Sequence, residues 1–323
     1  MQRDEDQADP MVRVAGLTRR FAGVTAVEGL TFSVGRGELF GLAGPDGAGK
    51  TTTLRMLAGV LAPSAGDAEV VGLSVARRPE AVKHHIAYMS QRFGLYTDLT
   101  VAENLAFYAD LYRVPRDERP ARLERLYEFS GLAPFRDRLA GRLSGGMKQK
   151  LGLSCALVHR PDVLLLDEPT FGVDPLSRRE LWLIVHEMVA EGVTAVVATS
   201  YMDEAERFDR LALLHGGRIV ALDRPSRLQE GFPGELLAIR VEDPRRARAA
   251  LAGLPAVRRA TVFGDSLRVH VASAEGDAPA VRRALEAAGQ PPRELASVRP
   301  SLEDVFIRYA AADEPGVSAG APP

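Results

Sequence analysis

The residues Gly44 to Thr51, GPDGAGKT, have the types and the spacing that bind phosphate groups. They match G-x-x-x-x-G-K-[ST], after the short apolar stretch ELFGLAG and before TTTLRMLAGVL, which has helical spacing. Glycines let the backbone curl so that successive N-H groups point at phosphates, and the positive end of the following helix adds to the attraction. Lys50 is suited to contact the β- and γ-phosphates, and Thr51 offers its hydroxyl to Mg²⁺. The pattern predicts a strand, a phosphate-binding loop and a helix.

Lysine is rare in this chain, so its positions are informative. The basic residues are almost all arginine, and the only lysines are Lys50, Lys83, Lys148 and Lys150. Lysine offers a compact ammonium on a flexible stem, whereas arginine offers a planar fork. A lysine at the end of the glycine-rich loop therefore favours a point-charge contact with phosphate.

Two acidic residues, Asp167 and Glu168, follow the apolar segment VLLLDEP. The segment predicts a strand buried on both faces, and open α/β sheets bind their ligands at the carboxyl ends of such strands. Asp167 is then placed to hold the Mg²⁺ shell and Glu168 to polarise an attacking water. An apolar strand that ends in two acids is common by itself, but beside a phosphate loop it indicates nucleotide hydrolysis.

A serine and two glycines open a third segment, LSGGMKQK. Its simplest interpretation is a helix start capped by Ser144. The same residues favour a second anion site, made of bare backbone N-H groups, the Ser144 hydroxyl and the nearby Lys148. One chain does not readily bring two such sites to one γ-phosphate. The pair therefore suggests a dimer in which each subunit completes the site of the other.

The surrounding segments predict an α/β fold with a mostly parallel core sheet. Residues 12–34 have the alternating pattern of strands, and the strand IAYMSQ ends near Gln91. Helical segments then run from Thr100 to Arg160, and Thr100 and Glu103 have the spacing of a capping box. Between VLLLDEP and the apolar run VTAVVATS, PLSRRELWLIVHEMVAEG predicts a crossover helix. The large domain thus combines a parallel core, an antiparallel β part and a helical insertion.

The segments after Pro225 predict a second, smaller domain. Their order is β, α, β, β, α, β, which is the ferredoxin-like α+β arrangement. The predicted ranges are a disordered N-terminus over 1–10, the nucleotide-binding domain over 11–230 with its helical part over about 92–160, the ferredoxin-like domain over 231–311 and a disordered tail over 312–323.

Composition limits the classes of partner. The 41 basic and 43 acidic residues give a formal net charge of -2, which offers no field for bulk attraction of nucleic acid, so we expect no nucleic-acid partner. The single cysteine suits a reducing compartment. The N-terminal residues lack the pattern of a secretory signal, and no apolar run has the roughly 20 residues that span a bilayer. We therefore expect a cytoplasmic protein that reaches a membrane only through a partner.

These motifs, in this order, resemble the ATP-binding cassette (ABC) family from about Val12 to Leu228. The resemblance implies an ATPase with ATP and Mg²⁺ as cofactors, which works as a dimer closed around two ATP molecules. It implies ATP contacts at Phe21, Gly44, Pro45, Asp46, Gly47, Ala48, Gly49, Lys50, Thr51 and Thr52. It implies that Ser144, Gly145, Gly146 and Lys148 form the signature that meets the ATP of the partner, and that Asp174 ends the D-loop. It implies Mg²⁺ contacts at Thr51, Gln91 and Asp167, and catalytic positions at Glu168, Gln91 and Ser200.

Within this family the chain resembles the ATPases of ABC-2 type exporters, particularly multidrug export ATPases and the first cassette of tandem-cassette exporters. The late motif PSLEDVFI, Pro300 to Ile307, and the ferredoxin-like domain carry this resemblance. It implies ABC-2 type membrane permease subunits, with the chain peripheral on the inner face of the cell membrane. Phe93, Leu95 and Tyr96 are candidates for the docking groove, and an equally good interpretation places them in the core of the helical insertion.

Two residues depart from the family pattern. Phe171 stands where the D-loop begins with small residues, which indicates altered subunit contacts. Ser200, in VVATSYMDEAERFD, stands where the family has a histidine that contacts the γ-phosphate. A serine hydroxyl donates one hydrogen bond, is shorter and carries no positive charge. Loss of one preorganised contact costs about 2.7 to 4 kcal/mol, or roughly 100- to 1000-fold in rate.

Ser200 leaves two hypotheses about partnership and one about class. The favoured hypothesis is a heterodimer, in which this subunit hydrolyses ATP poorly and its signature completes the site of a different, histidine-bearing cassette. The second is a homodimer in which a water or a neighbouring group replaces the histidine. The third is a non-transport ABC ATPase that acts on ribosomes or DNA, which the near-neutral charge and the single cassette disfavour.

Overall fold

The chain divides into two compact units at the bond between Arg224 and Pro225. The computed structural model describes residues 9–91 and 94–312. The division lies six residues before the expected position after residue 230, because α8 (Pro225–Glu230) packs against α11 (Leu302–Ala312) of the second unit. Of the termini predicted to be disordered, residues 1–8 and 313–323 lie outside the described part of the chain.

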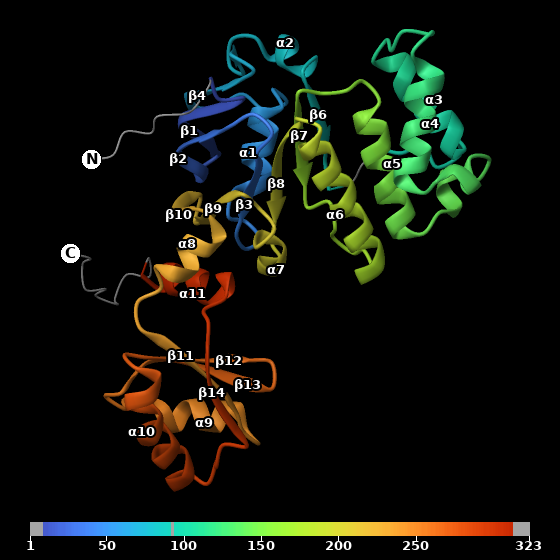
Figure 1. Ribbon diagram of the computed structural model, residues 1–323. Helices are drawn as coiled ribbons and strands as arrows, with labels where there is room; N and C mark the ends of the chain where they lie inside the picture. The colour runs from blue at the N-terminus through green and yellow to red at the C-terminus, as the bar shows by residue number, and fades with distance from the viewer. Residues whose placement is uncertain (1–8, 92–93, 313–323) are drawn as a thin grey trace. The chain divides into compact units, whose positions relative to one another are not determined.

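The first unit is built on a six-stranded, mostly parallel sheet (Figure 1). Its strand order is β10-β9-β3-β8-β7-β6, and only β10 runs antiparallel to its neighbour. The strands are β3 (Leu39–Ala43), β6 (Ile86–Met89), β7 (Val163–Asp167), β8 (Thr194–Thr199), β9 (Arg210–His215) and β10 (Arg218–Asp223). Every residue of β3, β7 and β8 is buried, which explains their continuous apolar sequences. The carboxyl ends of β3, β8, β7 and β6 therefore lie side by side at one edge.

A four-stranded antiparallel sheet packs on the same core. Its order is β2-β1-β4-β5, with β1 (Val12–Phe21), β2 (Val24–Val34), β4 (Ala65–Val70) and β5 (Leu73–Ser74). One hydrophobic cluster joins both sheets and the helix α1 (Lys50–Leu57), and the Phe32 ring stacks on the Phe40 ring at 5.1 Å. The short helix α2 (Pro79–Lys83) precedes β6. This shared core fixes where α1 begins, which is the end of the phosphate loop.

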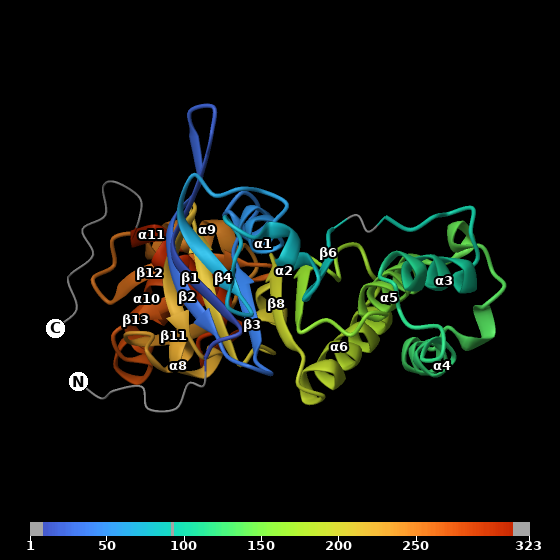
Figure 2. The ribbon, with the colours of Figure 1, turned by 90° about the horizontal axis from the view of Figure 1, so that it is seen from above.

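The predicted helical insertion forms between β6 and β7. It comprises α3 (Val101–Leu111), α4 (Arg119–Ser130), α5 (Gly145–Leu157) and two short 3-10 turns, Ala133–Phe135 and Ala140–Arg142. The predicted capping box of α3 is confirmed, because the Thr100 side chain accepts from the Glu103 N-H while Glu103 bonds back to Thr100. Figures 1 and 2 show α5 between α3 and the crossover helix α6 (Pro175–Ala190), and it packs on both. The helix α5 thus connects the insertion to the core.

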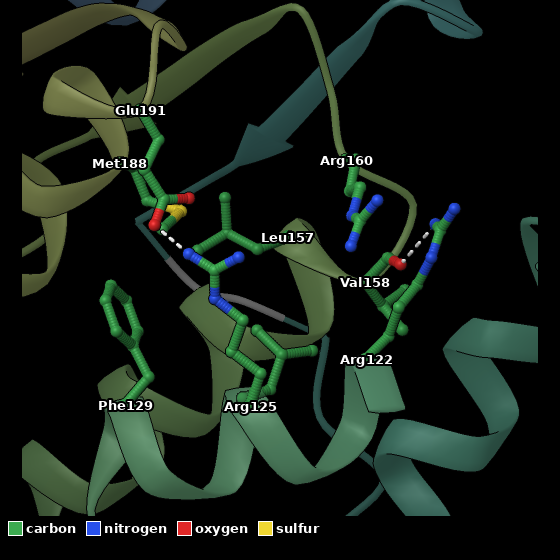
Figure 3. A pocket seen from close by; sticks show the side chains of 9 residues that line it. Arg122, Arg125, Phe129, Leu157, Val158, Arg160, Met188 and Glu191 are labelled. Carbon is green, nitrogen blue, oxygen red and sulfur yellow. Dashed lines mark hydrogen bonds and ion pairs between the residues drawn. The ribbon is translucent and has the colours of Figure 1, made fainter. Parts of the chain in front are cut away.

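Polar contacts join the insertion to the core where α4 faces the end of α6 (Figure 3). Arg125 of α4 pairs with Glu191, and Arg122 donates to the Val158 carbonyl at 3.3 Å. Between them lies a small cavity of about 60 Å³, lined by the apolar side chains of Leu126, Phe129, Leu157, Val158 and Met188 and by the polar ones of Arg122, Arg125, Arg160 and Glu191. A partly exposed ion pair contributes at most about 1 kcal/mol. Packing of α5 is therefore the main connection.

The second unit has the predicted β, α, β, β, α, β order. Its sheet is antiparallel with the order β12-β13-β11-β14, and α9 and α10 pack together and on the sheet. The elements are β11 (Glu235–Arg240), α9 (Pro244–Leu251), β12 (Val257–Phe263), β13 (Ser266–Val271), α10 (Ala274–Ala287) and β14 (Glu294–Val298). A separate hydrophobic cluster fills this unit. The fold prediction, an α/β cassette followed by a ferredoxin-like α+β unit, is confirmed.

The helices of both units are short or polar relative to a membrane-spanning helix. Over residues 9–91 and 94–312, none of the helices combines the length and the apolar character needed to cross a bilayer.

Candidate active site

The loop between β3 and α1 owes its shape to glycine. Gly47 and Gly49 have φ values of 79° and 100°, in the left-handed region that glycine adopts without a Cβ penalty. A Cβ on Gly49 would lie 2.6 Å from the Ala26 carbonyl oxygen, and one on Gly44 would lie 2.3 Å from the Leu214 carbonyl oxygen. The backbone therefore passes closer to its neighbours than any larger residue allows. It borders a cavity of about 420 Å³.

Lys50 is the buried cation of this site, with 4% of its surface exposed. Its ammonium donates to the carbonyl oxygens of Gly44 and Pro45 at 2.8 and 3.0 Å and to Ser200 Oγ at 2.9 Å. It also pairs with Glu168 Oε1 at 3.2 Å. An ammonium has three protons, so these partners use its full donor capacity. A phosphate that binds here must exchange with some of them.

Asp167 lies one residue before Glu168, almost fully buried. Thr51 Oγ1 donates to Asp167 Oδ1 at 2.9 Å, and the Tyr88 hydroxyl donates to Oδ2 at 3.3 Å. Burial raises the pKa of the Asp167 carboxyl, because desolvation disfavours its charged form. Burial likewise raises the pKa of Tyr88 to about 12. A nearby cation would favour the ionised Asp167, and one hydroxyl with one carboxylate is a donor set that fits Mg²⁺ when phosphates and waters supply the remaining ligands.

Glu168 combines burial with an unusual backbone. Its φ is 49°, a left-handed value that costs a non-glycine residue about 1 to 3 kcal/mol. Its N-H donates to the Ala198 carbonyl at 3.0 Å, which holds the end of β7 against β8. Ser200 Oγ lies 2.6 Å from Glu168 Oε1 and 3.1 Å from Asp46 Oδ1. Because a hydroxyl has one proton, the shorter contact to Glu168 is the better hydrogen bond.

Most of the predicted phosphate and catalytic residues surround the cavity. Those that line it are Asp46, Gly47, Ala48, Gly49, Lys50, Thr51, Thr52, Gln91 and Glu168. Ala26 and Phe171 line it as well, and neither was predicted there. Ser200 reaches the site through its contacts with Lys50 and Glu168. The phosphate loop after β3, Gln91 after β6, Glu168 after β7 and Ser200 after β8 thus converge from four separate parts of the sequence.

Phe21 is placed differently. It ends β1, is 42% exposed, and carries the Arg19 guanidinium 4.5 Å above its ring. It is not one of the described residues that line the cavity. The Arg19 guanidinium covers one face of this ring, and the adenine contact predicted for Phe21 stays a prediction.

The segment LSGGMKQK starts α5, next to the start of α6. Ser144 caps α5, its Oγ accepting from the Met147 N-H at 3.2 Å, and Asp174 caps α6 through the Ser177 N-H at 3.0 Å. The hydrogen bonds that Asp174 accepts from the backbone and the side chain of Ser177 lower the pKa of its carboxyl. A Cβ on Gly146 would lie 2.2 Å from Ser177 Oγ, so only glycine allows this approach. None of these residues is among the described residues of the cavity, so the two predicted anion sites are separate within one chain.

Comparison with known proteins identifies the family. Residues 27–171 match the ABC transporter family model, and residues 225–310 match the model of the ATP-binding protein DrrA1-3-like C-terminal domain. The chain is 34% identical over 300 residues to the daunorubicin/doxorubicin resistance ATP-binding protein DrrA of Streptomyces peucetius, with 92% of this chain and 91% of that protein covered. The chain belongs to the family of ABC transporter ATP-binding proteins. Members of this family are ATPases that bind ATP with Mg²⁺.

Two further relatives and one solved structure are also similar to this chain, and they differ in how much of their own length the chain covers. The chain is 44% identical over 303 residues to the probable multidrug ABC transporter ATP-binding protein YbhF of Escherichia coli K12, covering 93% of this chain but 52% of that protein, so it spans about half the relative's length. It is 35% identical over 301 residues to the Nod factor export ATP-binding protein I of Ralstonia nicotianae, with 93% of each covered. A solved ATP-binding subunit of an ABC transporter covers 68% of this chain and 92% of its own, at 31% identity and a TM-score of 0.63.

Three features of the cassette are not predicted by its sequence patterns. Phe171 lines the cavity and is 55% exposed, whereas its sequence context indicates only altered subunit contacts. Ala26 contributes a carbonyl next to Gly49, a contact that no side-chain pattern signals. Tyr88 bonds Asp167 from the neighbouring strand, and its polar hydroxyl near the end of an apolar strand was the available signal.

Proposed function

We propose that this chain is the ATP-hydrolysing subunit of an ABC-2 type exporter, that it drives export through separate membrane subunits, and that its own site hydrolyses ATP slowly. Membership of the ABC family supports ATP hydrolysis. The names of the relatives support export, since they describe multidrug transport, daunorubicin resistance and Nod factor export. The DrrA-like C-terminal domain supports the same group.

The position of Ser200 Oγ carries the proposal of slow hydrolysis. It lies 2.9 Å from Lys50 Nζ and 2.6 Å from Glu168 Oε1, where the family resemblance implies a histidine. Its single proton is directed to Glu168, so none is left for the γ-phosphate, and the hydroxyl carries no positive charge. The missing contact costs about 2.7 to 4 kcal/mol, or roughly 100- to 1000-fold in rate. Nucleotide affinity should fall less, because the phosphate loop and Lys50 are intact.

The remaining side chains divide the work of hydrolysis. Lys50 would contact the β- and γ-phosphates after it releases Glu168 and Ser200. Thr51, Asp167 and Gln91 would hold Mg²⁺, which supplies neutralising charge to the phosphate oxygens. Glu168, once free of Lys50, would accept a proton from the attacking water. Its left-handed backbone keeps the carboxylate at the cavity while the peptide N-H stays bonded to β8.

A second cassette would complete the site. The start of α5, with Ser144, Gly145, Gly146 and Lys148, presents a helix N-terminus that the chain's own cavity does not include. Asp174 caps the adjoining helix, so the signature and the D-loop form one surface. We favour a heterodimer with a histidine-bearing cassette, because such a partner would place a competent site against this intact signature. A homodimer is the alternative.

The membrane subunits would dock on the helical insertion, which would hold the chain on the inner face of the cell membrane. Tyr96 is 44% exposed and its ring packs edge-on against Phe107 at 4.6 Å, and Leu95 is half-buried beside it. Phe93, the third candidate, lies outside the described residues. Exposed aromatic rings are common anchors in protein interfaces. Recovery of ribosomes and no membrane protein with the tagged chain would contradict transport.

Steady-state ATPase activity of the full chain tests the slow site. We expect Ser200→His to raise kcat at least tenfold, towards the roughly 100- to 1000-fold limit of one restored contact. Lys50→Ala and Glu168→Gln in the Ser200→His background should abolish this activity, which excludes a contaminating ATPase. Equal kcat for the wild type and Ser200→His would contradict the proposal. Addition of a histidine-bearing cassette to the wild type should restore turnover if the heterodimer is correct.

A further inference from the structure

Glu204 is a buried carboxylate that the reaction described above does not use. It lies in α7 (Met202–Ala205), four residues after Ser200, with 1% of its surface exposed. Thr170 Oγ1 donates to Oε1 at 2.5 Å, and Thr199 Oγ1 donates to Oε2 at 2.8 Å. A buried carboxylate is costly unless its oxygens are satisfied. The two threonine hydroxyls satisfy one oxygen of Glu204 each.

Two further contacts come from α6, one a hydrogen bond and the other an ion pair. Trp182 Nε1 donates to Glu204 Oε1 at 3.3 Å, and the Arg178 guanidinium pairs with the same oxygen at 3.6 Å. The Arg178 guanidinium also lies 4.5 Å above the ring of Tyr201, the residue after Ser200. Glu204 thus joins three segments: the end of β7, the end of β8 and the crossover helix.

The two threonines that bind Glu204 lie close in the sequence to Glu168 and Ser200. Thr170 is two residues after Glu168, and the Phe171 N-H that follows it donates to the Glu168 carbonyl at 3.1 Å. Thr199 directly precedes Ser200, and its Oγ1 accepts from the Tyr201 N-H at 3.1 Å. The carboxylate of Glu204 is therefore the common partner of the segments that carry Glu168 and Ser200.

We propose that Glu204 is a positioning residue for hydrolysis, which holds the Glu168 segment and the Ser200 segment at a fixed separation by binding Thr170 and Thr199. The inference rests on the proposed ATPase function. Glu204 is not among the described residues that line the cavity, so it acts through Glu168 and Ser200. Nucleotide binding that changes the contacts of Glu168 should then also change the surroundings of the Trp182 ring.

The test removes single hydroxyls without changing side-chain shape. Thr170→Val and Thr199→Val each delete one hydrogen bond to Glu204. Thr194→Val is the matched control, since Thr194 is equally buried in β8 but bonds to Gly35 and Gly37 at the opposite end of the strand. We expect Thr170→Val and Thr199→Val to lower kcat about tenfold or more, with KM for MgATP within about twofold of the wild type. Thr194→Val should retain both constants.

The single tryptophan of the chain provides a readout independent of turnover, because Trp182 bonds Glu204 directly. MgATP should change the Trp182 emission in the wild type and in Thr194→Val, with a response at least about threefold smaller in Thr170→Val and Thr199→Val. Glu204→Gln, which keeps shape and an acceptor oxygen, should retain more of kcat than Glu204→Ala.

Three outcomes would overturn the inference: an equal loss of kcat in Thr194→Val, a loss confined to KM, or an unchanged Trp182 response in both hydroxyl variants. If calorimetry shows MgATP binding and no phosphate is released, the proposed hydrolysis fails, while the Trp182 response still decides whether Glu204 connects the two segments. If MgATP does not bind at all, both proposals fail.

Discussion

At the scale of single residues, hydrogen bonds and backbone geometry hold the side chains of Lys50 and Glu168 in place. Lys50 uses its three protons on two loop carbonyls and Ser200, and it also pairs with Glu168. Glu168 holds a left-handed backbone. Nucleotide binding must therefore replace existing bonds, which makes the geometry of the glycine-rich loop critical.

We predict different costs for two glycines of this loop. Gly47→Ala meets no atom within 4 Å and incurs only the left-handed backbone penalty, about 1 to 2 kcal/mol. Gly49→Ala adds a clash with the Ala26 carbonyl at 2.6 Å, for a total of about 2 to 5 kcal/mol. Thermal unfolding should show Gly49→Ala melting well below Gly47→Ala, at about 2 to 4 °C per kcal/mol. Equal midpoints for the two variants would show that the loop relaxes around the added methyl group.

At the scale of elements, the starts of α5 and α6 depend on each other. Gly146 of α5 faces Ser177 of α6, and Asp174 caps α6 by the N-H of the same Ser177. The glycine in the signature is thus explained within one chain by close packing of two helices. That explanation is compatible with a second role toward a partner, because Ser144 and Gly145 remain exposed.

We predict that Gly146→Ala destabilises the chain by about 1 to 3 kcal/mol, because its Cβ would lie 2.2 Å from Ser177 Oγ. The matched control is Gly145→Ala, whose nearest atom is 3.8 Å away, and it should stay within about 1 kcal/mol of the wild type. Ser177→Gly should recover part of the loss in the double variant, a coupling measurable by urea unfolding. Additive effects of the two changes would refute direct contact.

At the scale of the whole molecule, the chain carries two separate hydrophobic clusters. One joins both sheets of the first unit, and the other lies within residues 237–295 of the second. A unit with its own core is expected to fold alone. The second unit contributes no described residue to the cavity of the active site.

We predict that fragments divided between Arg224 and Pro225 fold independently. Residues 1–224 should bind MgATP within about threefold of the full chain, and residues 225–323 should unfold cooperatively on heating, as followed by circular dichroism. A fragment cut after residue 230 instead would remove α8 from its contact with α11, so the shorter second unit should melt lower. A second fragment without a cooperative transition would contradict the independence of the two cores.

The sequence alone determined the classes of chemistry and the main elements. Four features follow from local patterns, in which residue type and spacing along the chain are sufficient for the prediction. They are the phosphate loop, the acidic pair after β7, the capping box of α3 and the ferredoxin-like order of the second unit. The boundary at Arg224 was less accessible, because the contact of α8 with α11 joins segments about seventy residues apart in the sequence.

Only the tertiary structure decided how the site residues meet. Ser200 reaches Lys50 across 150 positions, and Thr170 reaches Glu204 across 34. Phe171 lines the cavity although its sequence context indicated a subunit contact. The physical reason is the strand order β3-β8-β7-β6, which sets the carboxyl ends of distant segments side by side. The packing of the buried strands determines this strand order, and the spacing of residues along the chain does not predict it.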